Sequence, residues 1–570
     1  MKPRMTSVAT ILAALVVVAG CGGQSVSGSR DGRAAREIQP EAERTRALIL
    51  LSKFEPKTLT ARVTSGGEPQ LRTGLFTAGL AFTDEHDLDF PLLAPALPEL
   101  NTGSWQVFAD GRMQTTYRLK PNLTWHDGTP LVAEDFLFAR RVVTDPQSAV
   151  FTFQPEDRQI EDILAPDPQT LIFRWRGLYK AAGGLRYDPL PRHLLEKSFL
   201  EEDPNAFLNR SYWTTEFVHL GPYRLAHWEP GAFIEAEAFD GYALGRPKIA
   251  RIQVRWSGDP NVAVTNLLSG AAHFASDPGI TFQEASTLKR VWVSEGGGSV
   301  VLTPSSMRYV QFQRRSEYAR PGMITDLRVR RALAHSVDRA ALADSMLEGE
   351  GQPADTFVSP GTVFYDAVQR AVVKYPYDLR RTDQLMREAG FNRGADGVYT
   401  HPLDGRFAPE IRGFVGGQEE REIAILADGW RRAGFDVSEY SVPPAQGLAG
   451  EVRSTFPALA ANFFGAGRYG SPEFFVASAI PRADNGWVGN NRGGWSSPEF
   501  DQLNELLNAA LDQEGQASVL AQLWTVVSED LGGLPTYYNV SVRAYSAALR
   551  GPLPSTYWNL HAWEWKETLT

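Results

Sequence analysis

Short apolar runs alternate with amphipathic helical patterns along most of the chain, which predicts a mixed α/β fold. Residues 46–51 (RALILL) form a continuous apolar run, which is typical of a buried strand. Apolar and polar residues alternate in 232–238 (AFIEAEA) and 249–256 (IARIQVRW), as expected for half-buried strands. Two further strands are predicted at 115–119 and at 221–225.

Several segments combine helical spacing with a residue that can begin or end a helix. Glu134 and Asp135 lie in the first turn of a predicted helix that reaches about Val143, where acidic side chains are favoured. Asp326 can cap a helix whose apolar or small residues recur at helical spacing up to Val337. Further helices are expected at 262–268, 338–347, 498–511 and 517–527.

The first 20 residues have the pattern of a secretory signal. Lys2 and Arg4 precede an apolar run at 11–19, which is shorter than the roughly 20 residues that span a bilayer. The sequence then reads Val-Ala-Gly-Cys, which resembles the bacterial lipobox. We therefore expect a signal peptide at 1–20 and lipidation of Cys21. The alternative is an ordinary signal with a chance cysteine.

Residues 21–47 are predicted to form the lipidated cysteine and a flexible tether, because they lack aromatic residues and are rich in Gly, Ser and charge. The 570 residues of the chain suit two to four domains. No later stretch reaches 18 consecutive apolar residues, so we expect the body of the protein to be soluble and to lie outside the cytoplasm.

Composition argues against several classes of binding protein and metal protein. Lys and Arg number 57 against 67 Asp and Glu, which gives a formal net charge of -10. No broad basic field therefore favours nucleic acid or anionic lipid. The single cysteine excludes an intrachain disulfide and a multi-cysteine metal site, and the nine histidines form no short helical zinc motif.

No sequence motif supports catalysis. The chain has neither a P-loop nor a GxGxxG fingerprint. Residues 286–289 match Ser-x-x-Lys, but the companion Ser-Asp-Asn and Lys-Thr-Gly motifs are absent. We therefore predict a protein without catalytic residues, metal or cofactor, and a secreted hydrolase is an alternative that no motif supports.

Aromatic residues make up 11% of the chain, and some lie in glycine-rich segments. Residues 463–470 read FFGAGRYG, and residues 485–495 read NGWVGNNRGGW. Aromatic, amide and arginine side chains on flexible backbone are typical of a ligand cleft. The alternative is a surface loop that Trp487 and Trp495 hold in place.

A series of motifs keeps a fixed order from about residue 48 to the end of the chain. Residues 125–136 read WHDGTPLVAEDF, against a pattern W-x-D-G-x-P-x-x-A-E-D-V, and residues 327–340 read LRVRRALAHSVDRA, against V-R-x-A-[LI]-x-x-x-[IV]-D-R. The other matching segments are 190–195, 221–225, 242–247, 268–270, 496–511 and 534–538. In this ordered set the chain resembles the family 5 extracellular solute-binding proteins of ABC transporters, the peptide/nickel group.

The resemblance implies an α/β type II periplasmic-binding fold with two lobes, three domains and a cleft that closes about a hinge. Domain I is expected to be discontinuous and to comprise 48–75, 201–305 and 533–570. Domain II is expected at 76–200 and domain III at 306–532. The resemblance also implies solute binding without bond chemistry, with an ABC permease and ATPase complex as partner.

The chain departs from the family pattern at 464–472, which read FGAGRYGSP. Peptide binders of the family usually carry W-x-A-D-Y-x-x-P, whose Asp pairs with the α-ammonium of the peptide. Here Arg468 lies beside that position, and the lost charge-assisted bond is worth about 1.5–3 kcal/mol. A neutral, anionic, N-blocked or sugar ligand is therefore favoured over a dipeptide held by its N-terminus.

The same segments provide the predicted ligand contacts. These are Phe464, Gly465, Arg468, Tyr469, Trp487 and Trp495, with the backbone of Thr77–Leu80 as a further contributor. The leading hypothesis is a monomeric, lipid-anchored substrate-binding component of an ABC importer, on the extracytoplasmic face of the cell membrane, for oligopeptides or peptide-like solutes. The alternatives are an oligosaccharide or other non-peptide ligand, and a surface sensor that works without a transporter.

Overall fold

The structure is a computed structural model that describes residues 46–60, 62, 69–146, 155–465, 467–554 and 557–566. The predicted signal peptide 1–20, Cys21 and the predicted tether up to residue 45 lie outside the described residues. From Ala47 onward the chain forms one compact unit.

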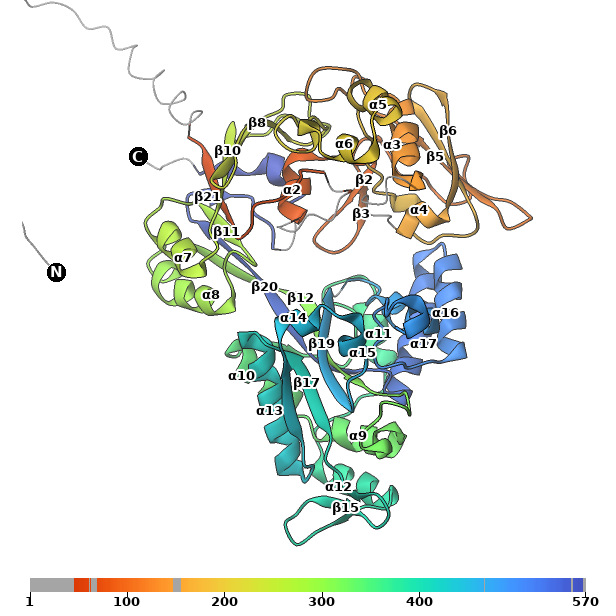
Figure 1. The fold of residues 1–570 in the computed structure, drawn as a ribbon. Coiled ribbons are helices and arrows are strands. Elements are labelled where there is room, and N and C mark those ends of the chain that lie inside the picture. The colour runs from red at the N-terminus through yellow and green to blue at the C-terminus, as the bar shows by residue number, and fades with distance from the viewer. Residues whose placement is uncertain are drawn as a thin grey trace, which may run out of the picture. The chain divides into compact units, whose positions relative to one another are not determined.

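A mixed sheet runs through this unit, and eleven of its strands lie in the described residues. In spatial order they are β18 (Ser438–Val442), β17 (Glu410–Phe414), β19 (Leu459–Gly465), β12 (Gly298–Phe312), β20 (Leu534–Ser546), β11 (Phe274–Ser276), β1 (Leu48–Ser52), β10 (Arg251–Trp256), β9 (Phe233–Ala238) and β8 (Tyr223–Glu229), with β13 (Gln352–Pro353) also paired to β20. Together with the helices around it, this sheet confirms the predicted mixed α/β class (Figure 1).

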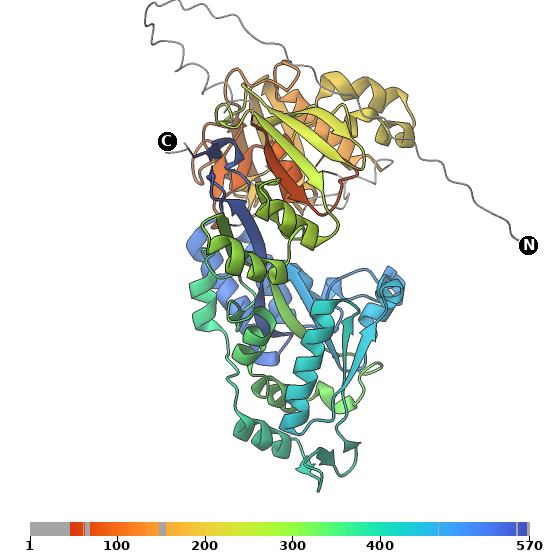
Figure 2. The ribbon, with the colours of Figure 1, turned by 90° about the vertical axis from the view of Figure 1, so that its left-hand side faces the viewer.

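Two long antiparallel strands connect two separate sets of apolar cores. β12 has 15 residues and β20 has 13, and they pair from Gly298↔Ser546 to Val310↔Leu534. We call residues 46–297 and 547–566 the first lobe, and residues 313–533 the second lobe. Figures 1 and 2 show β12 and β20 passing from one lobe to the other, which is the arrangement that a hinge requires.

The first lobe is built around one large core that draws on widely separated parts of the chain, including Leu48, Trp125, Ile252 and Trp563. Its further strands are β2 (Ala81–Thr83), β3 (Asp89–Pro91), β4 (Trp105–Val107), β5 (Met113–Arg118), β6 (Ile160–Asp167), β7 (Thr170–Trp175), β21 (Leu549–Arg550) and β22 (Glu564–Trp565). Its helices are α2 (Pro69–Phe76), α3 (Glu134–Thr144), α4 (Pro155–Gln159), α5 (Arg192–Glu201), α6 (Pro204–Leu208), α7 (Pro260–Leu268) and α8 (Phe282–Leu288). Because one core spans the predicted domains I and II, their boundaries stay a prediction.

The second lobe has a core on each face of its sheet, because alternate residues of β12 point to opposite faces. Val310 and Phe312 pack in one core, and Met307 and Tyr309 pack in the other. The first core is covered by α9 (Leu327–His335), α10 (Arg339–Leu347), α12 (Leu379–Glu388) and α13 (Gly417–Ala433), and the second by α11 (Tyr365–Ala371), α16 (Pro498–Ala509) and α17 (Gln513–Asp530). The remaining elements are α14 (Pro444–Gly447), α15 (Gly450–Ser454), β14 (Asn392–Arg393), β15 (Tyr399–His401) and β16 (Gly405–Arg406).

Most elements predicted from local pattern are present, with shifted ends. Asp326 caps α9 by accepting a hydrogen bond from the backbone N–H of Arg328 at 2.8 Å, as predicted. α17 begins four residues earlier than predicted, because Asp512 caps it by accepting from the N–H of Gly515 at 2.8 Å. Its first turn precedes the apolar stripe, so periodicity alone could not place this end.

The motif at 125–136 serves as an internal support of the first lobe. The buried carboxylate of Asp135 accepts hydrogen bonds from Trp125 Nε1 at 3.3 Å and from the backbone N–H groups of Val132 and Arg192, each at 3.1 Å. These bonds join the loop, α3 and the start of α5. The family motif therefore holds the fold, and its acid lies in the first turn of α3 as predicted.

Two buried histidines, His126 within this motif and His219 in contact with it, make acid destabilisation an expected result. Burial lowers the pKa of His126 to about 4 and that of His219 to about 3. In the unfolded chain both take up protons near pH 6.5, whereas in the folded protein they stay neutral. The free energy of unfolding should therefore fall from pH 6.5 towards pH 4, by up to ~1.4 kcal/mol per pH unit for each histidine.

Urea unfolding at pH 7.5 and pH 5 measures this effect. We expect the free energy of unfolding to differ less between the two pH values in His126→Gln than in the wild type. In His227→Gln, whose side chain is half-exposed, the difference should stay as in the wild type. Equal pH dependence in wild type and His126→Gln would show that His126 does not contribute.

Candidate ligand-binding site

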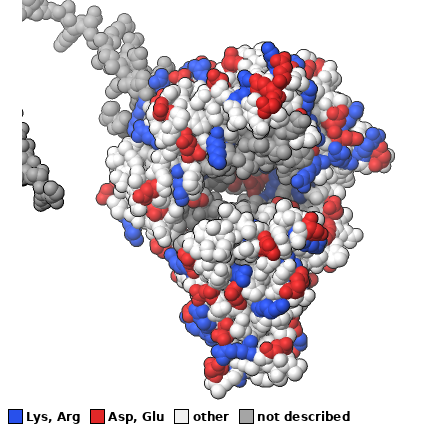
Figure 3. All heavy atoms as spheres, in the orientation of Figure 1, with Lys and Arg blue, Asp and Glu red and all other residues white. Residues whose placement is uncertain are grey.

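The carboxyl ends of the parallel strands β17, β18 and β19 define the candidate site in the second lobe. β17 runs parallel to both β18 and β19, and β12 enters the lobe antiparallel to β19 beside Gly465. In open α/β sheets, ligands bind outside the carboxyl ends of parallel strands. Figure 3 shows the surface hollowed between the two lobes, in the region where Figure 1 places β12, β19 and β20.

A buried ion pair lies at this end of the sheet. Arg308 of β12 is 3% exposed, and its Nε donates to Glu422 Oε2 of α13 at 3.1 Å. Glu419 Oε1 lies 3.6 Å from Arg308 Nη1, and the Phe463 ring, which is 53% exposed, lies 5.1 Å from its Cζ. Burial opposes the charge of Arg308, but the adjacent Glu422 carboxylate outweighs it and raises the pKa of the guanidinium.

Amide side chains in the same region are hydrogen-bonded to residues of the hinge strands β12 and β20. Gln418 at the start of α13 donates from Nε2 to Asn539 Oδ1 of β20 at 3.1 Å. On the opposite face of the sheet, Asn462 Nδ2 donates to Gln311 Oε1 at 3.3 Å. These groups can bind neutral polar parts of a solute, such as amides or hydroxyls.

The structure places Arg468 between the lobes. Its Nη2 lies 2.8 Å from Asp89 Oδ2 in β3 of the first lobe, and its Nη1 donates to the carbonyl of Asp87. The sequence has no acid near the expected Asp, but in the structure Asp89 reaches this place from 379 residues away. Because the guanidinium already has partners, the role of Arg468 as a ligand contact stays a prediction.

Tyr469 takes part in a second contact between the lobes. Its hydroxyl donates to Gln516 Oε1 at 2.9 Å, and its ring lies 4.5 Å from Nζ of Lys180 in the first lobe. Lys180 Nζ also donates to Asn508 Oδ1 of α16 at 3.0 Å, and burial lowers the pKa of Lys180 to about 8. Arg468 and Tyr469 are thus brought together where the lobes meet.

The other predicted contact residues are not all in one place. Phe464 is 4% exposed and Trp495 is 1% exposed, and both pack in the core under α16 and α17. Gly465 is exposed at the end of β19, and Trp487 is half-buried in its loop. In the described conformation Phe464 and Trp495 present their side chains to the core, and a ligand role for these four residues stays a prediction.

The backbone of Thr77–Leu80 is largely engaged within the first lobe. The N–H of Ala78 donates to His219 Nδ1 at 3.4 Å, and the N–H of Leu80 donates to the carbonyl of Tyr187 at 3.2 Å. Neither donor is therefore available in this conformation. A contribution from this backbone to ligand binding stays a prediction.

Several polar residues near this edge were not singled out in the sequence. Gln418, Glu419 and Glu422 follow β17, Arg453 lies in α15 after β18, Arg492 lies in the glycine-rich segment 485–495, and Asn539 lies in β20. Except for 485–495, these segments carry no recognisable motif, and only the folded chain brings them together. For Gln418 and Glu419, the position just after a short strand was the available signal.

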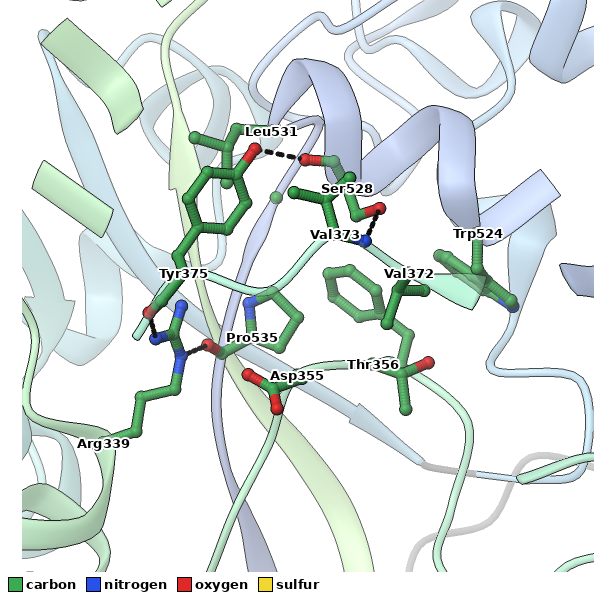
Figure 4. A pocket seen from close by; sticks show the side chains of 12 residues that line it. Arg339, Asp355, Thr356, Val372, Val373, Tyr375, Trp524, Ser528, Leu531 and Pro535 are labelled. Carbon is green, nitrogen blue, oxygen red and sulfur yellow. Dashed lines mark hydrogen bonds between the residues drawn. The ribbon is translucent and has the colours of Figure 1, made fainter. Parts of the chain in front are cut away.

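A pocket inside the second lobe is lined by residues of β20, α17 and the segments on either side of α11 (Figure 4). Arg339 donates from Nε to the carbonyl of Pro535 at 2.8 Å and from Nη1 to that of Tyr375 at 2.6 Å. The Tyr375 hydroxyl donates to the carbonyl of Ser528 at 2.7 Å. Because these groups satisfy one another, we assign the pocket to packing rather than to ligand binding.

Among the described residues, no group of three or more His, Cys, Asp or Glu side chains is arranged to hold a metal ion. No helix in the described part of the chain combines the length and the apolar character needed to cross a membrane.

Comparisons with known proteins agree with this architecture. A sequence profile of the bacterial extracellular solute-binding proteins, family 5 middle, matches residues 96–485. Protein XP55 of Streptomyces lividans is 26% identical over 498 residues, which cover 86% of this chain and 83% of that protein. The oligopeptide-binding protein AppA of Bacillus subtilis is 23% identical over 513 residues, which cover 86% of this chain and 88% of that protein.

Solved structures show the same fold. NikZ from Campylobacter jejuni, in complex with Ni(L-His), superposes with a TM-score of 0.69 at 19% identity, over 91% of this chain and 99% of that chain. This likeness confirms the predicted periplasmic-binding fold. Since the family profile covers more than half of the sequence, the chain belongs to family 5 of the bacterial extracellular solute-binding proteins.

Proposed function

We propose that this protein captures an oligopeptide or peptide-like solute between its lobes and delivers it to an ABC permease. The observation that carries the proposal is the pair of contacts that join the lobes across the hinge, from Arg468 to Asp89 and from Lys180 to Asn508. Such contacts can form when the lobes close and break when they open. Ligand binding then acts by shifting this equilibrium, with no bond chemistry.

Similarity supports a peptide-like ligand. AppA, which matches along most of its length, is an oligopeptide-binding protein. A non-peptide solute is the second candidate, because Arg468 lies beside the position where peptide binders of the family usually carry an acid, and the carboxylate of nearby Asp89 is engaged with Arg468.

A thermal-shift screen of residues 22–570 against pooled oligopeptides, oligosaccharides and metal chelates tests the proposal. A ligand at about 100 times its dissociation constant stabilises the folded protein by about 2.7 kcal/mol. A shift with the peptide pool supports the leading proposal, and a shift with another pool alone supports a non-peptide solute. If no pool shifts the melting temperature and mass spectrometry finds no co-purified solute, the sensor alternative becomes the better account.

We further propose that Cys21 carries the lipid anchor on the extracytoplasmic face of the membrane. Cys21→Ala should therefore release the protein from the membrane fraction, because the only cysteine of the sequence is the expected acylation site. Immunoblotting of membrane and soluble fractions measures this, with Ser25→Ala as the matched control. A Cys21→Ala protein that stays in the membrane fraction would rule out this anchor.

A further inference from the structure

Two arginines of the candidate site lack an acidic partner. Arg453 of α15 has its guanidinium 5.6 Å from the Phe414 ring, and its Nε is buried without a hydrogen-bond partner among the described residues. Arg492 is 8% exposed, and its guanidinium makes one long hydrogen bond, from Nη2 to Asn490 Oδ1 at 3.4 Å. Within the described chain, neither guanidinium has a carboxylate at ion-pair distance.

The segments of the two arginines lie side by side, because Arg315 donates from Nη2 to the carbonyl of Ser454 and to that of Arg492. Burial lowers the pKa of Arg492 to about 10, and the positive charge of Arg453 contributes to this shift. Glu419 is the acid whose charge acts on both. Its carboxylate is already in use, since Oε2 accepts from the N–H of Phe414 at 2.9 Å and Oε1 lies 3.6 Å from Arg308 Nη1.

The charges at this edge are therefore unbalanced. Arg308 is neutralised by Glu422, and Glu419 alone remains for Arg453 and Arg492. A buried guanidinium without a counter-charge is costly, because it has lost its hydration. An anionic group supplied from outside the chain would remove this cost.

The surrounding contacts place Arg453 beside the carboxyl end of β17 and fix the segment of Arg492 against β12. Phe414, whose ring lies under Arg453, is the last residue of β17. Gln311 of β12 donates from Nε2 to the carbonyl of Asn490 at 3.3 Å, which fixes the segment that carries Arg492. A Cβ on Gly450 would lie only 2.6 Å from the Trp487 carbonyl oxygen, so the start of α15 packs directly on that segment.

We propose that Arg453 and Arg492 form an anion subsite of the ligand cleft, which binds a carboxylate of the solute. A guanidinium presents a planar fork of N–H donors that matches a carboxylate, and two such groups can bind its two oxygens. This inference rests on the proposed function and names the chemical class of the solute, an acidic one. The carboxylate can belong to a peptide terminus or side chain, or to a small organic acid.

The test compares carboxylate probes with and without Arg453, using the full chain. Succinate is titrated against sodium chloride at equal ionic strength, and a tripeptide pool with free carboxyl termini is compared with the same pool amidated. We expect a saturable thermal shift with succinate in the wild type, and binding about 10- to 100-fold weaker in Arg453→Gln. Arg412→Gln, which removes an arginine already paired with Glu410 on β17, should bind as the wild type does.

The outcomes separate the subsite from the proposed function. Unchanged binding in a folded Arg453→Gln protein, or no carboxylate-dependent shift in the wild type, would overturn the anion subsite. Equal binding of free and amidated peptides, unaffected by Arg453→Gln, would overturn it as well while leaving solute capture intact. Arg453-dependent binding of succinate without binding of either peptide pool would support the subsite and count against a peptide ligand.

Discussion

Glu422→Gln is expected to destabilise the folded protein by about 3–5 kcal/mol, because it leaves Arg308 buried without its counter-charge. Glu422 is 1% exposed, and its carboxylate accepts from Nε and Nη2 of Arg308. Glu419 is 3.6 Å from the same guanidinium but also accepts from the Phe414 N–H, so it compensates only in part. Urea unfolding followed by circular dichroism measures the loss.

Two controls show whether the loss comes from the buried charge. Glu439→Gln breaks a more exposed ion pair with Arg431 and should cost less than ~1 kcal/mol. The double substitution Arg308→Met with Glu422→Leu removes both charges and should recover most of the stability, since apolar replacements of buried pairs are often neutral. A Glu422→Gln protein as stable as the Glu439→Gln control would contradict the assignment.

Arg468→Gln is expected to raise the ratio of open to closed molecules about 10- to 100-fold, because it removes a charge-assisted contact between the lobes. The side chains of Arg468 and Asp89 are 19% and 17% exposed, so water screens this ion pair only partly. Loss of the contact favours the open state, and it should weaken ligand binding in proportion.

Spin labels in the two lobes can measure this change. Since the sequence has a single cysteine, at position 21, labels can be placed at Leu200→Cys and Leu403→Cys, both exposed, in residues 22–570. We expect a longer or broader distance distribution in Arg468→Gln, and an unchanged one in Arg406→Gln, whose partners Asp396 and Asp436 lie in the same lobe. If Arg468→Gln leaves the distances unchanged, the contact does not hold the lobes together.

Local pattern predicted the elements well, because their signals lie within one turn or one strand. The capping role of Asp326 and the strands near 46–51 and 249–256 are of this kind. The family motifs also predicted the two-lobed fold. By contrast, Pro304 interrupts the apolar pattern of β12, so sequence did not reveal a strand of 15 residues across the hinge.

The candidate site was harder to predict, because its geometry depends on residues far apart in sequence. Arg468 appeared free to bind a ligand, but Asp89 of the other lobe neutralises it. Phe464 and Trp495 lie in glycine-rich segments that resemble ligand loops, yet α16 and α17 cover them. Arg453 carried no motif, Arg492 was one of many polar residues in segment 485–495, and only the folded chain brings the two segments together, where Arg315 binds the carbonyls of Ser454 and Arg492.

The positions of the arginines favour a solute specificity other than capture of a peptide by its α-ammonium. The arginine at position 468 is engaged between the lobes, and the unpaired positive charge lies at Arg453 and Arg492 instead. An acidic or N-blocked solute would suit this distribution of charge better than a free dipeptide.

We expect a solute to close the two lobes about β12 and β20. The distance between labels at positions 200 and 403, before and after addition of the pool that raises the melting temperature, measures this closure. We expect a shift to one shorter, narrower distribution, and a smaller shift in Arg453→Gln at the same concentration. A distribution that does not change at saturating ligand would show that the lobes do not close on binding.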